Sequence, residues 1–448
     1  MAAAEARPGM PPGGAMRPGG SRPSLRKATI VFRYRNYRYL WFSSLFAFTG
    51  MQMQQVARAL LAWELTESYG AVGAVSLSFG LPMLMFSLIG GSLADRFEKR
   101  NLTLMTQSVT SVLALLTAIL VFTDTITIQI LLAIGFVQGI FFAFGMPART
   151  PLMADAVGRE NVMSAIAMSN AAMNATRLFA PAVAGVMVVV WGLSTAFFAQ
   201  AVVYVLSCLV ILRVPTGISE AANAGMARQI RGNMFVEIGR GLRYASTDPQ
   251  LRTLFATLFV VTFFAMPYIM LLAGFVHEDL GRGDGAFGVL QSASGAGALV
   301  GAIGIATLTE FDRKPMLQWA FGLVGGASLV ALAFSAGSFG FAGALIATVV
   351  LGFAFTAYQT LNNTMVMDAA KPEYYGRIMS INMLTFSAMP IMAYPLGAIA
   401  DHIGAQTTFT SMGLIVLGSL LLMAFVNPRY TFGRDQRPAA FEVAPAAD

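Results

Sequence analysis

Two arginines interrupt long apolar stretches of this 448-residue chain, and both could recognise an anionic group. Arg58 lies within the stretch 39–65, and Arg177 lies near the middle of the stretch 163–189. A charged side chain inside an apolar membrane segment is costly, so it predicts a functional site by default. A guanidinium suits carboxylate, catecholate or phosphate groups. The alternative is that either arginine only braces neighbouring helices through carbonyls and amides.

Neutral polar residues share helical faces with these arginines. Their spacing of three or four residues places Asn170 and Asn174 on the face of Arg177, and Gln55 on the face of Arg58. Polar residues of the second half could line the same cavity or could bond neighbouring helices instead. The predicted lining of a substrate cavity consists of Gln54, Gln55, Arg58, Asn170, Asn174, Arg177, Tyr358, Gln359, Asn362, Asn363 and Asn382.

The 22 acidic residues avoid the interior of the apolar stretches. A proton-driven exporter is expected to bury a carboxylate whose pKa is raised by loss of solvent. The remaining candidates for proton coupling are Glu64, Asp155 and His277, each of which could equally have a structural role.

The composition indicates what must position these residues. The chain is 56% hydrophobic and 11% charged, whereas soluble domains are about 25% charged. Because a bilayer span needs about 20 apolar residues and must satisfy its own backbone groups, the apolar stretches predict membrane-spanning helices. Twelve such stretches occur: 39–65, 71–94, 102–122, 126–147, 163–189, 191–213, 252–276, 286–308, 315–335, 339–362, 377–400 and 405–426.

Most of the 29 basic residues precede the first stretch or fall in connections on the same side of the predicted membrane. Basic loops stay cytoplasmic, which predicts an inner-membrane protein with both termini in the cytoplasm. The net charge of +7 then needs no nucleic-acid partner.

The two halves of the chain repeat each other at a nearly constant offset. The sequence at 70–73, GAVG, returns as GAFG at 285–288, and Asp155 matches Asp368. We therefore expect an all-α protein with two pseudo-symmetric six-helix bundles, 39–213 and 252–426. The linker 214–251 carries apolar residues at helical spacing, which favours an amphipathic surface helix over a plain connection. The basic segment 1–38 and the segment 427–448 are expected to be disordered tails.

A glycine-rich and charged loop follows the second stretch. Its glycines would let a neighbouring helix approach closely, and its carboxylate could accept hydrogen bonds from a helix N-terminus. The basic residues could pair across the mouth of the protein. This predicted cytoplasmic gate consists of Gly90, Gly91, Asp95, Arg96, Lys99 and Arg100.

This loop resembles the signature loop of the major facilitator superfamily, G-x-L-A-D-R-x-G-[RK]-[RK]. Glu98 occupies the second glycine position, as in the enterobactin exporters and related secretion effector transporters. The resemblance implies bundles that rock around a midplane cavity, a loop that locks the cytoplasmic side, and a monomer. Pro181 and Gly185 resemble an incomplete form of the antiporter motif G-P-x-x-G-G, in which alanines replace two glycines. This resemblance implies export by exchange. The corresponding loop of the second half, around residues 304–313, no longer matches the signature, because Leu308 stands in place of the aspartate.

The residues that other classes of function would require are absent from the sequence. No phosphate-binding loop and no hydrolase motif occurs, and one cysteine with two histidines cannot form a zinc cluster. No enzyme activity, cofactor or metal is expected. We predict a secondary transporter that exports a small amphipathic or anionic molecule by proton antiport. The alternatives are uptake or facilitated movement of an organic anion, and a sensor that does not transport.

Overall fold

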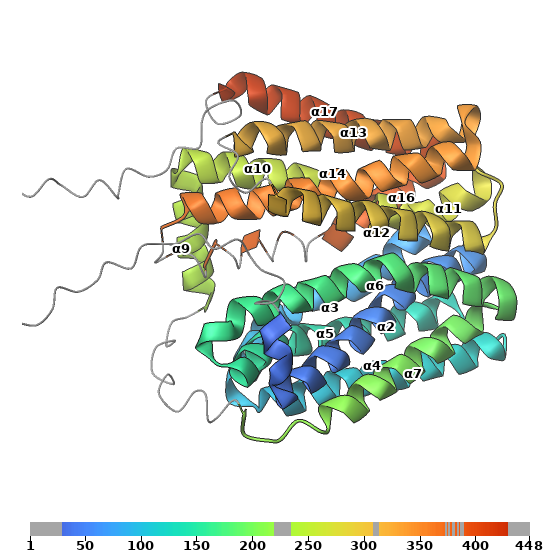
Figure 1. Ribbon diagram of the computed structural model, residues 1–448. Coiled ribbons are helices and arrows are strands. Elements are labelled where there is room, and N and C mark those ends of the chain that lie inside the picture. Colours follow the sequence, from blue (N-terminus) through green and yellow to red (C-terminus); the bar gives the residue numbers. More distant parts are fainter. Residues whose placement is uncertain are drawn as a thin grey trace, which may run out of the picture.

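The computed structural model describes residues 29–218, 234–307, 313–371, 374, 377–378, 381–382, 385 and 389–428. Within these ranges the chain forms helices joined by short connections (Figure 1). The first half contains η1 (Thr29–Arg33), α2 (Arg35–Thr66), α3 (Tyr69–Arg96), α4 (Lys99–Phe122), α5 (Ile128–Val157), η2 (Arg159–Asn161), α6 (Val162–Trp191) and α7 (Leu193–Ile211).

The second half repeats this plan. It contains α9 (Met234–Thr247), α10 (Pro249–Phe264), α11 (Tyr268–Glu278), α12 (Asp284–Thr307), α13 (Lys314–Ser338), α14 (Gly340–Ala369), α16 (Met389–Ile403) and α17 (Ala405–Val426). The helices α10 and α11 form one candidate span that is interrupted just before Tyr268. Pro267 causes this break, since proline lacks the N–H that would continue the helical ladder.

Ten helices of the described chain are long and apolar enough to cross a membrane, which confirms the predicted class of fold. Two expected spans fall outside that group. The helix α2 has 32 residues but carries three glutamines, Arg58 and Glu64 in its second half. The described part of α16 has only 15 residues. The linker helix is present as α9, and its position on a membrane surface stays a prediction.

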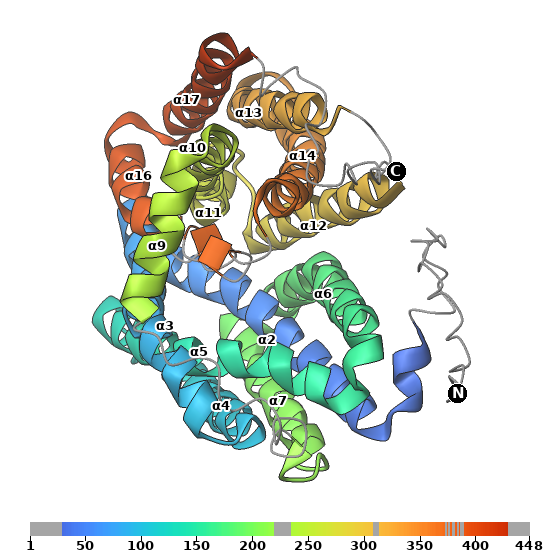
Figure 2. The same ribbon diagram turned by 90° about the vertical axis from the view of Figure 1, so that its left-hand side faces the viewer.

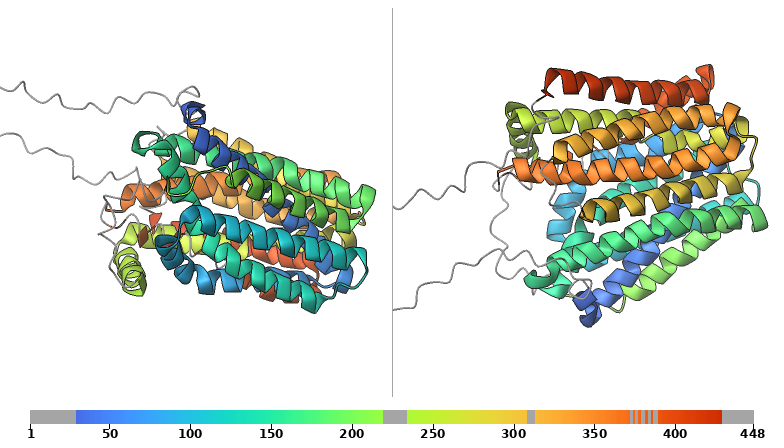
Figure 3. Two further views of the ribbon diagram at one scale, coloured as in Figure 1. Left: turned by 90° about the horizontal axis from the view of Figure 1, so that it is seen from below. Right: turned by 45° about the horizontal axis from the view of Figure 1, so that its top comes forward.

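The helices gather into an N-terminal bundle, α2 to α7, and a C-terminal bundle, α10 to α17 (Figure 2). The views of Figure 3 show the same division. The end of the bundles that carries α9, on the left of Figure 1, is called the terminus side below, and the opposite end the distal side.

The two bundles meet along two helix pairs, α3 with α16 and α6 with α12. Glycines allow the backbones of the paired helices to approach each other closely. A Cβ on Gly73 would collide with the backbone of Ala393, and a Cβ on Gly185 would meet Gly288. Close backbone packing of small residues is the usual way in which membrane helices associate.

A carboxylate closes the distal side. Asp401, at the end of α16, accepts hydrogen bonds from the backbone N–H groups of Tyr69 (2.6 Å) and Gly70 (2.9 Å). It also accepts from the Ser68 hydroxyl at 2.8 Å. These donors form the N-terminus of α3, where the helix dipole favours a negative charge. The Tyr69 hydroxyl donates in turn to Glu278 of the C-terminal bundle at 2.9 Å.

The remaining described hydrogen bond between the bundles, from Ser76 to the sulfur of Met270, also lies in the distal half. Met163 and Asn170 in the first half of α6 are exposed, and so is Arg177 in its middle. The described chain is therefore closed by hydrogen bonds at the distal end and open on the terminus side, in the sense that no described hydrogen bond joins the bundles there.

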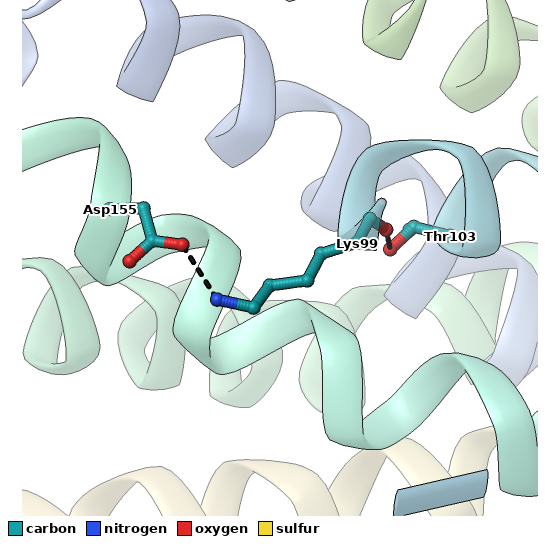
Figure 4. Close-up of polar contacts among 3 residues, drawn as sticks. All are labelled: Lys99, Thr103 and Asp155. Atoms are coloured by element: carbon teal, nitrogen blue, oxygen red, sulfur yellow. Dashed lines mark hydrogen bonds and ion pairs between the residues drawn. The ribbon is translucent and has the colours of Figure 1, made fainter. Parts of the chain in front are cut away.

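Matching ion pairs support the internal repeat. Lys99 at the start of α4 contacts Asp155 near the end of α5 at 2.8 Å (Figure 4). Lys314 at the start of α13 contacts Asp368 near the end of α14, also at 2.8 Å. The same pair thus joins the equivalent helices of each bundle.

One arginine requires a correction. The predicted span 126–147 ends two residues before Arg149, which places this arginine among the basic residues of the connections. The helix α5 instead continues through Pro147 and Pro151 to Val157, so Arg149 lies inside the N-terminal bundle.

Replacing Asp401 by asparagine should favour opening of the distal side. Loss of a charged helix cap costs about 1–2 kcal/mol, which corresponds to a shift of roughly 5- to 30-fold in population. Spin labels on the exposed residues Thr125 and Ser338, in a Cys208→Ser background, would report the distance between the bundles. We expect a larger fraction of long distances in the Asp401→Asn protein.

The matched control is Glu67→Gln, which removes an exposed carboxylate at the same end that makes no hydrogen bond within the described chain. It should leave the distance distribution unchanged. Equal distributions in all three proteins would show that the cap does not hold the distal side closed.

Candidate functional site

A cavity of about 220 Å³ lies between the bundles, below the closed distal layer. Both bundles contribute to it, as expected for a substrate site at the interface of two repeats. Three of the predicted residues, Gln54, Gln55 and Arg58, lie in its wall. The full lining is Met51, Gln54, Gln55, Arg58, Ala59, Val72, Val75, Ser76, Phe79, Met83, Ile269, Met270, Gln291, Met389 and Pro390.

Arg58 is the charged group of this cavity. Its side chain is only 9% exposed, and its Nη1 donates to Oε1 of Gln138 at 3.2 Å. Gln54 donates to the same oxygen. The Nε and Nη2 atoms of Arg58 are buried and have no partner. No described acidic residue forms an ion pair with it, so a cation with unused donors faces the cavity.

The position of the guanidinium depends on a glycine of α5. A Cβ on Gly135 would collide with Nη2 of Arg58 and with the Ser78 hydroxyl. The guanidinium also lies over the ring of Phe79, at 5.8 Å from its centroid. The pairing of α3 with α5 thus creates a slot that a long, flat side chain from α2 can fill.

The other walls are apolar and adaptable. Met51, Met83, Met270 and Met389 contribute flexible and polarizable side chains, which can adjust to irregular ligands. Gln291 and Ser76 add neutral polar groups. Sequence analysis missed Gln138, although it lies in the interior of the stretch 126–147 and could have been identified on that ground.

The polar face of α6 lies apart from this cavity. Asn170 and Arg177 are exposed, and Asn174 is half-buried. Arg177 interacts electrostatically with Tyr268, whose hydroxyl bonds Ser294 at 2.8 Å. A ligand entering from the open side would meet this face before it reached Arg58.

The helix-five motif serves the contact between the bundles. Pro181 is buried, and a Cβ on Gly288 would meet both the Pro181 carbonyl and Gly185. This placement agrees with a packing role for the motif, and its part in exchange stays a prediction.

The structure does not bring the polar set of the second half into the cavity. Tyr358 and Asn362 are buried inside the C-terminal bundle, where Gln318 donates to Asn362 at 2.7 Å. Asn382 donates to Asn363 at 2.6 Å and so joins a neighbouring helical segment to α14. Gln359 is half-buried and does not line the cavity either.

The candidates for proton coupling also lie outside the cavity. Asp155 is paired with Lys99, and Glu64 is exposed at the distal end of α2. His277 contacts Asp284 at 2.9 Å and stacks on Trp63, with ring centroids 6.3 Å apart.

Sequence reasoning missed another distal carboxylate. Burial raises the pKa of Asp279, which follows the span ending at Glu278 and accepts a hydrogen bond from Gln406 at 2.9 Å. Apart from Asp155, these titratable groups therefore lie at the distal mouth and not beside Arg58.

The predicted gate loop is described in part. A Cβ on Gly90 would collide with the carbonyl of Ala143, so the glycine fits a close crossing of α3 and α5. Arg100 donates to the Leu212 carbonyl at 3.1 Å, which fixes the loop to the end of α7. The surroundings of Gly91 and the side chains of Asp95 and Arg96 lie outside the described parts, as does Leu308.

The arrangement of two helix bundles around a central cavity defines a class of membrane transporters. A solved structure of the nucleoside transporter NupG matches with a TM-score of 0.67 at 14% identity, covering 88% of this chain and 99% of the other. A peptide-transporter-type (POT family) structure in complex with 5-aminolevulinic acid matches with a TM-score of 0.68 at 14% identity, covering 89% and 97%. These matches show the fold alone.

The chain belongs to the transmembrane secretion effector family of the major facilitator superfamily, whose model matches residues 28–445. The staphyloferrin A transporter of Staphylococcus aureus is 23% identical over 87% of this chain and 96% of its own. The multidrug efflux pump Tap of Mycolicibacterium fortuitum is 24% identical over 84% and 92%. Macrolide efflux protein A of Streptococcus pyogenes is 22% identical over 88% and 98%. The family is one of transporters and not of enzymes.

The prediction that Gly135 leaves room for the guanidinium of Arg58 can be tested without a substrate. Gly135→Ala should lower the thermal stability, because the new methyl group would displace the buried guanidinium. In an Arg58→Gln background the same change should cost less, since the shorter side chain leaves room. The expected coupling between the two positions is about 1–2 kcal/mol in a double-mutant cycle of unfolding.

Gly418→Ala is the matched control, because no atom lies within 4 Å of a Cβ at that helical position. It should be neutral or stabilising, and its effect should be the same with either residue at position 58. Additive effects of Gly135→Ala and Arg58→Gln would contradict the proposed slot.

Proposed function

We propose that this protein exports a small amphipathic or anionic organic molecule by alternating access. The observation that carries this proposal is Arg58, a buried cation with unused donors in a cavity whose described lining contains no carboxylate. A guanidinium in a poorly solvated site gains most from an anionic partner. The methionine-rich walls suit the apolar part of the same ligand.

The orientation expected from the basic residues supports outward transport. With both termini in the cytoplasm of an inner-membrane protein, the terminus side is cytoplasmic and the structure is open inward. The cavity can then load from the cell interior. The names of two similar proteins, both efflux proteins, agree with outward transport.

We further propose that protons drive the export and that the protein acts as a monomer. The proton-binding groups would be those of the distal mouth, where Glu64, His277, Asp279 and Asp284 gather. Their distance from Arg58 implies that protons and substrate bind at separate sites and compete through the conformation of the bundles.

Facilitated movement of an organic anion is the second candidate. It is favoured by the same lack of a carboxylate in the cavity wall, since an anion can follow its own gradient without a proton-binding partner. The two candidates differ in whether a pH gradient alone moves the substrate.

Flux into proteoliposomes under an imposed pH gradient tests both candidates. An anionic catecholate and a cationic lipophilic drug would be compared in wild-type, Arg58→Gln and Arg58→Lys proteins. We expect gradient-driven flux of the anion that falls about 10- to 100-fold in Arg58→Gln, the usual cost of losing a charged hydrogen bond. Arg58→Lys should retain part of the flux, because it keeps the charge without the planar donors.

Arg177→Ala is the matched comparison. Because Arg177 lies on the entry path and outside the cavity, its loss should slow the anion less than the loss of Arg58. Anion flux without any response to pH would support facilitated movement. Transport of the cation alone would contradict recognition of an anion, and unchanged flux in Arg58→Gln would contradict the role of Arg58.

A further inference from the structure

A second arginine is buried in the N-terminal bundle with unused donors. The guanidinium of Arg149 lies over the ring of Phe48, at 4.6 Å from its centroid. Its Nε donates to the Ser44 hydroxyl at 3.2 Å, while Nη2 is buried without a partner. Among the described residues no carboxylate pairs with it, and the titratable group that acts on it is Tyr204. The charge is therefore uncompensated, as at Arg58.

Arg149 lines a small cavity of its own. The cavity holds about 50 Å³ between α2, α4, α5 and α7 and contains Tyr204, Gln107 and three threonines of α4 in its wall. The Tyr204 hydroxyl makes no hydrogen bond to the described chain, so it can donate into this space beside the guanidinium. The volume suits a halide ion or one carboxylate group, since a water molecule occupies about 30 Å³ of liquid.

The internal repeat shows that the fold does not require this charge. The offset that relates Asp155 to Asp368 also relates Arg149 to Asn362. Asn362 accepts a hydrogen bond from Gln318, and Gln318 lines the corresponding small cavity of the C-terminal bundle. A neutral amide therefore occupies the equivalent position, and the guanidinium is a feature of one bundle only.

The two buried arginines lie along one helix. Phe48, which stacks on Arg149, and Arg58 are ten residues apart on α2, or about 15 Å at 1.5 Å per residue. Met51 lies between them and contributes to both cavities. The cavity of Arg149 is nearer the terminus side, from which the structure is open.

We propose that Arg149 and Tyr204 form a second anion subsite, which binds a halide ion or a single carboxylate group on the terminus side of the Arg58 cavity. The subsite is separate from the proposed substrate cavity and does not depend on the direction of transport. Its ligand comes either from the solution, as a halide, or from a carboxylate of an organic molecule that moves along α2.

Thermal unfolding of the purified full-length protein tests this subsite with two probes. Sodium chloride and sodium acetate would each be titrated at constant ionic strength against a bulky inert anion. Binding to the folded state alone raises the melting temperature in a saturable way. Because Arg58 is itself proposed to bind an anion, Arg149→Asn is compared in an Arg58→Gln background. We expect saturable stabilisation by at least one probe in the wild-type and Arg58→Gln proteins, and its loss when Arg149→Asn is added to Arg58→Gln.

Arg149→Asn introduces the residue that the other bundle carries at this position, so the variant should fold. Without added anion its melting temperature should equal or exceed that of the wild type, because a buried unpaired charge is removed. Tyr204→Phe provides a second test, since it keeps the ring and should weaken the response to anion several-fold.

Each result of these titrations either supports or contradicts the proposed subsite. Stabilisation by chloride alone identifies a halide site, and stabilisation by acetate alone identifies a carboxylate site. A response that persists when Arg149→Asn is added to Arg58→Gln, or no saturable response in the wild type, would overturn the proposal. A lower melting temperature of Arg149→Asn under all conditions, with an unchanged response to anion, would show that Arg149 only braces the bundle.

Discussion

The structure depends on the burial of positive charge in an apolar bundle without a matching acid. A guanidinium inside a membrane protein is stable only if polar groups surround it or an anion joins it. For Arg58 the protein supplies Gln138 and the room left by Gly135, and it leaves two donors unused. The free-energy cost of burying these unpaired donors is offset only when an anion binds. In the proposed function, these unused donors give the N-terminal bundle its affinity for an anion.

The C-terminal bundle solves the same packing problem with neutral groups. Its interior pairs Gln318 with Asn362, and its helical segments are joined through Asn363 and Asn382. The ion pairs of Lys99 with Asp155 and of Lys314 with Asp368 show how much of the ancestral repeat persists at the terminus side. The two halves thus share a scaffold and differ in the charge that they bury, and the proposed recognition of an anion rests on one half.

The class of fold and the residue Arg58 could be predicted from the sequence, because an apolar run and a charge within it are both visible without coordinates. Arg149 was missed, since it lies beyond residue 147, where the apolar stretch was ended, whereas the helix continues to Val157. Tyr358 and Asn362 were predicted to line the cavity, but the structure places them inside the C-terminal bundle, for a different reason. Helical spacing shows which residues share a face, but it does not show whether that face points to the other bundle or into its own.

The glycine contacts between the bundles bear on the ease of motion. Where α3 crosses α16 and α6 crosses α12, backbone lies against backbone at Gly73, Gly185 and Gly288. At these positions no pair of side chains must change rotamer when the helices tilt. If the bundles rock as proposed, the hydrogen bonds at the distal rim contribute directly to the barrier between the two states. The rate of interconversion can be adjusted there during evolution without altering the chemistry of the cavity.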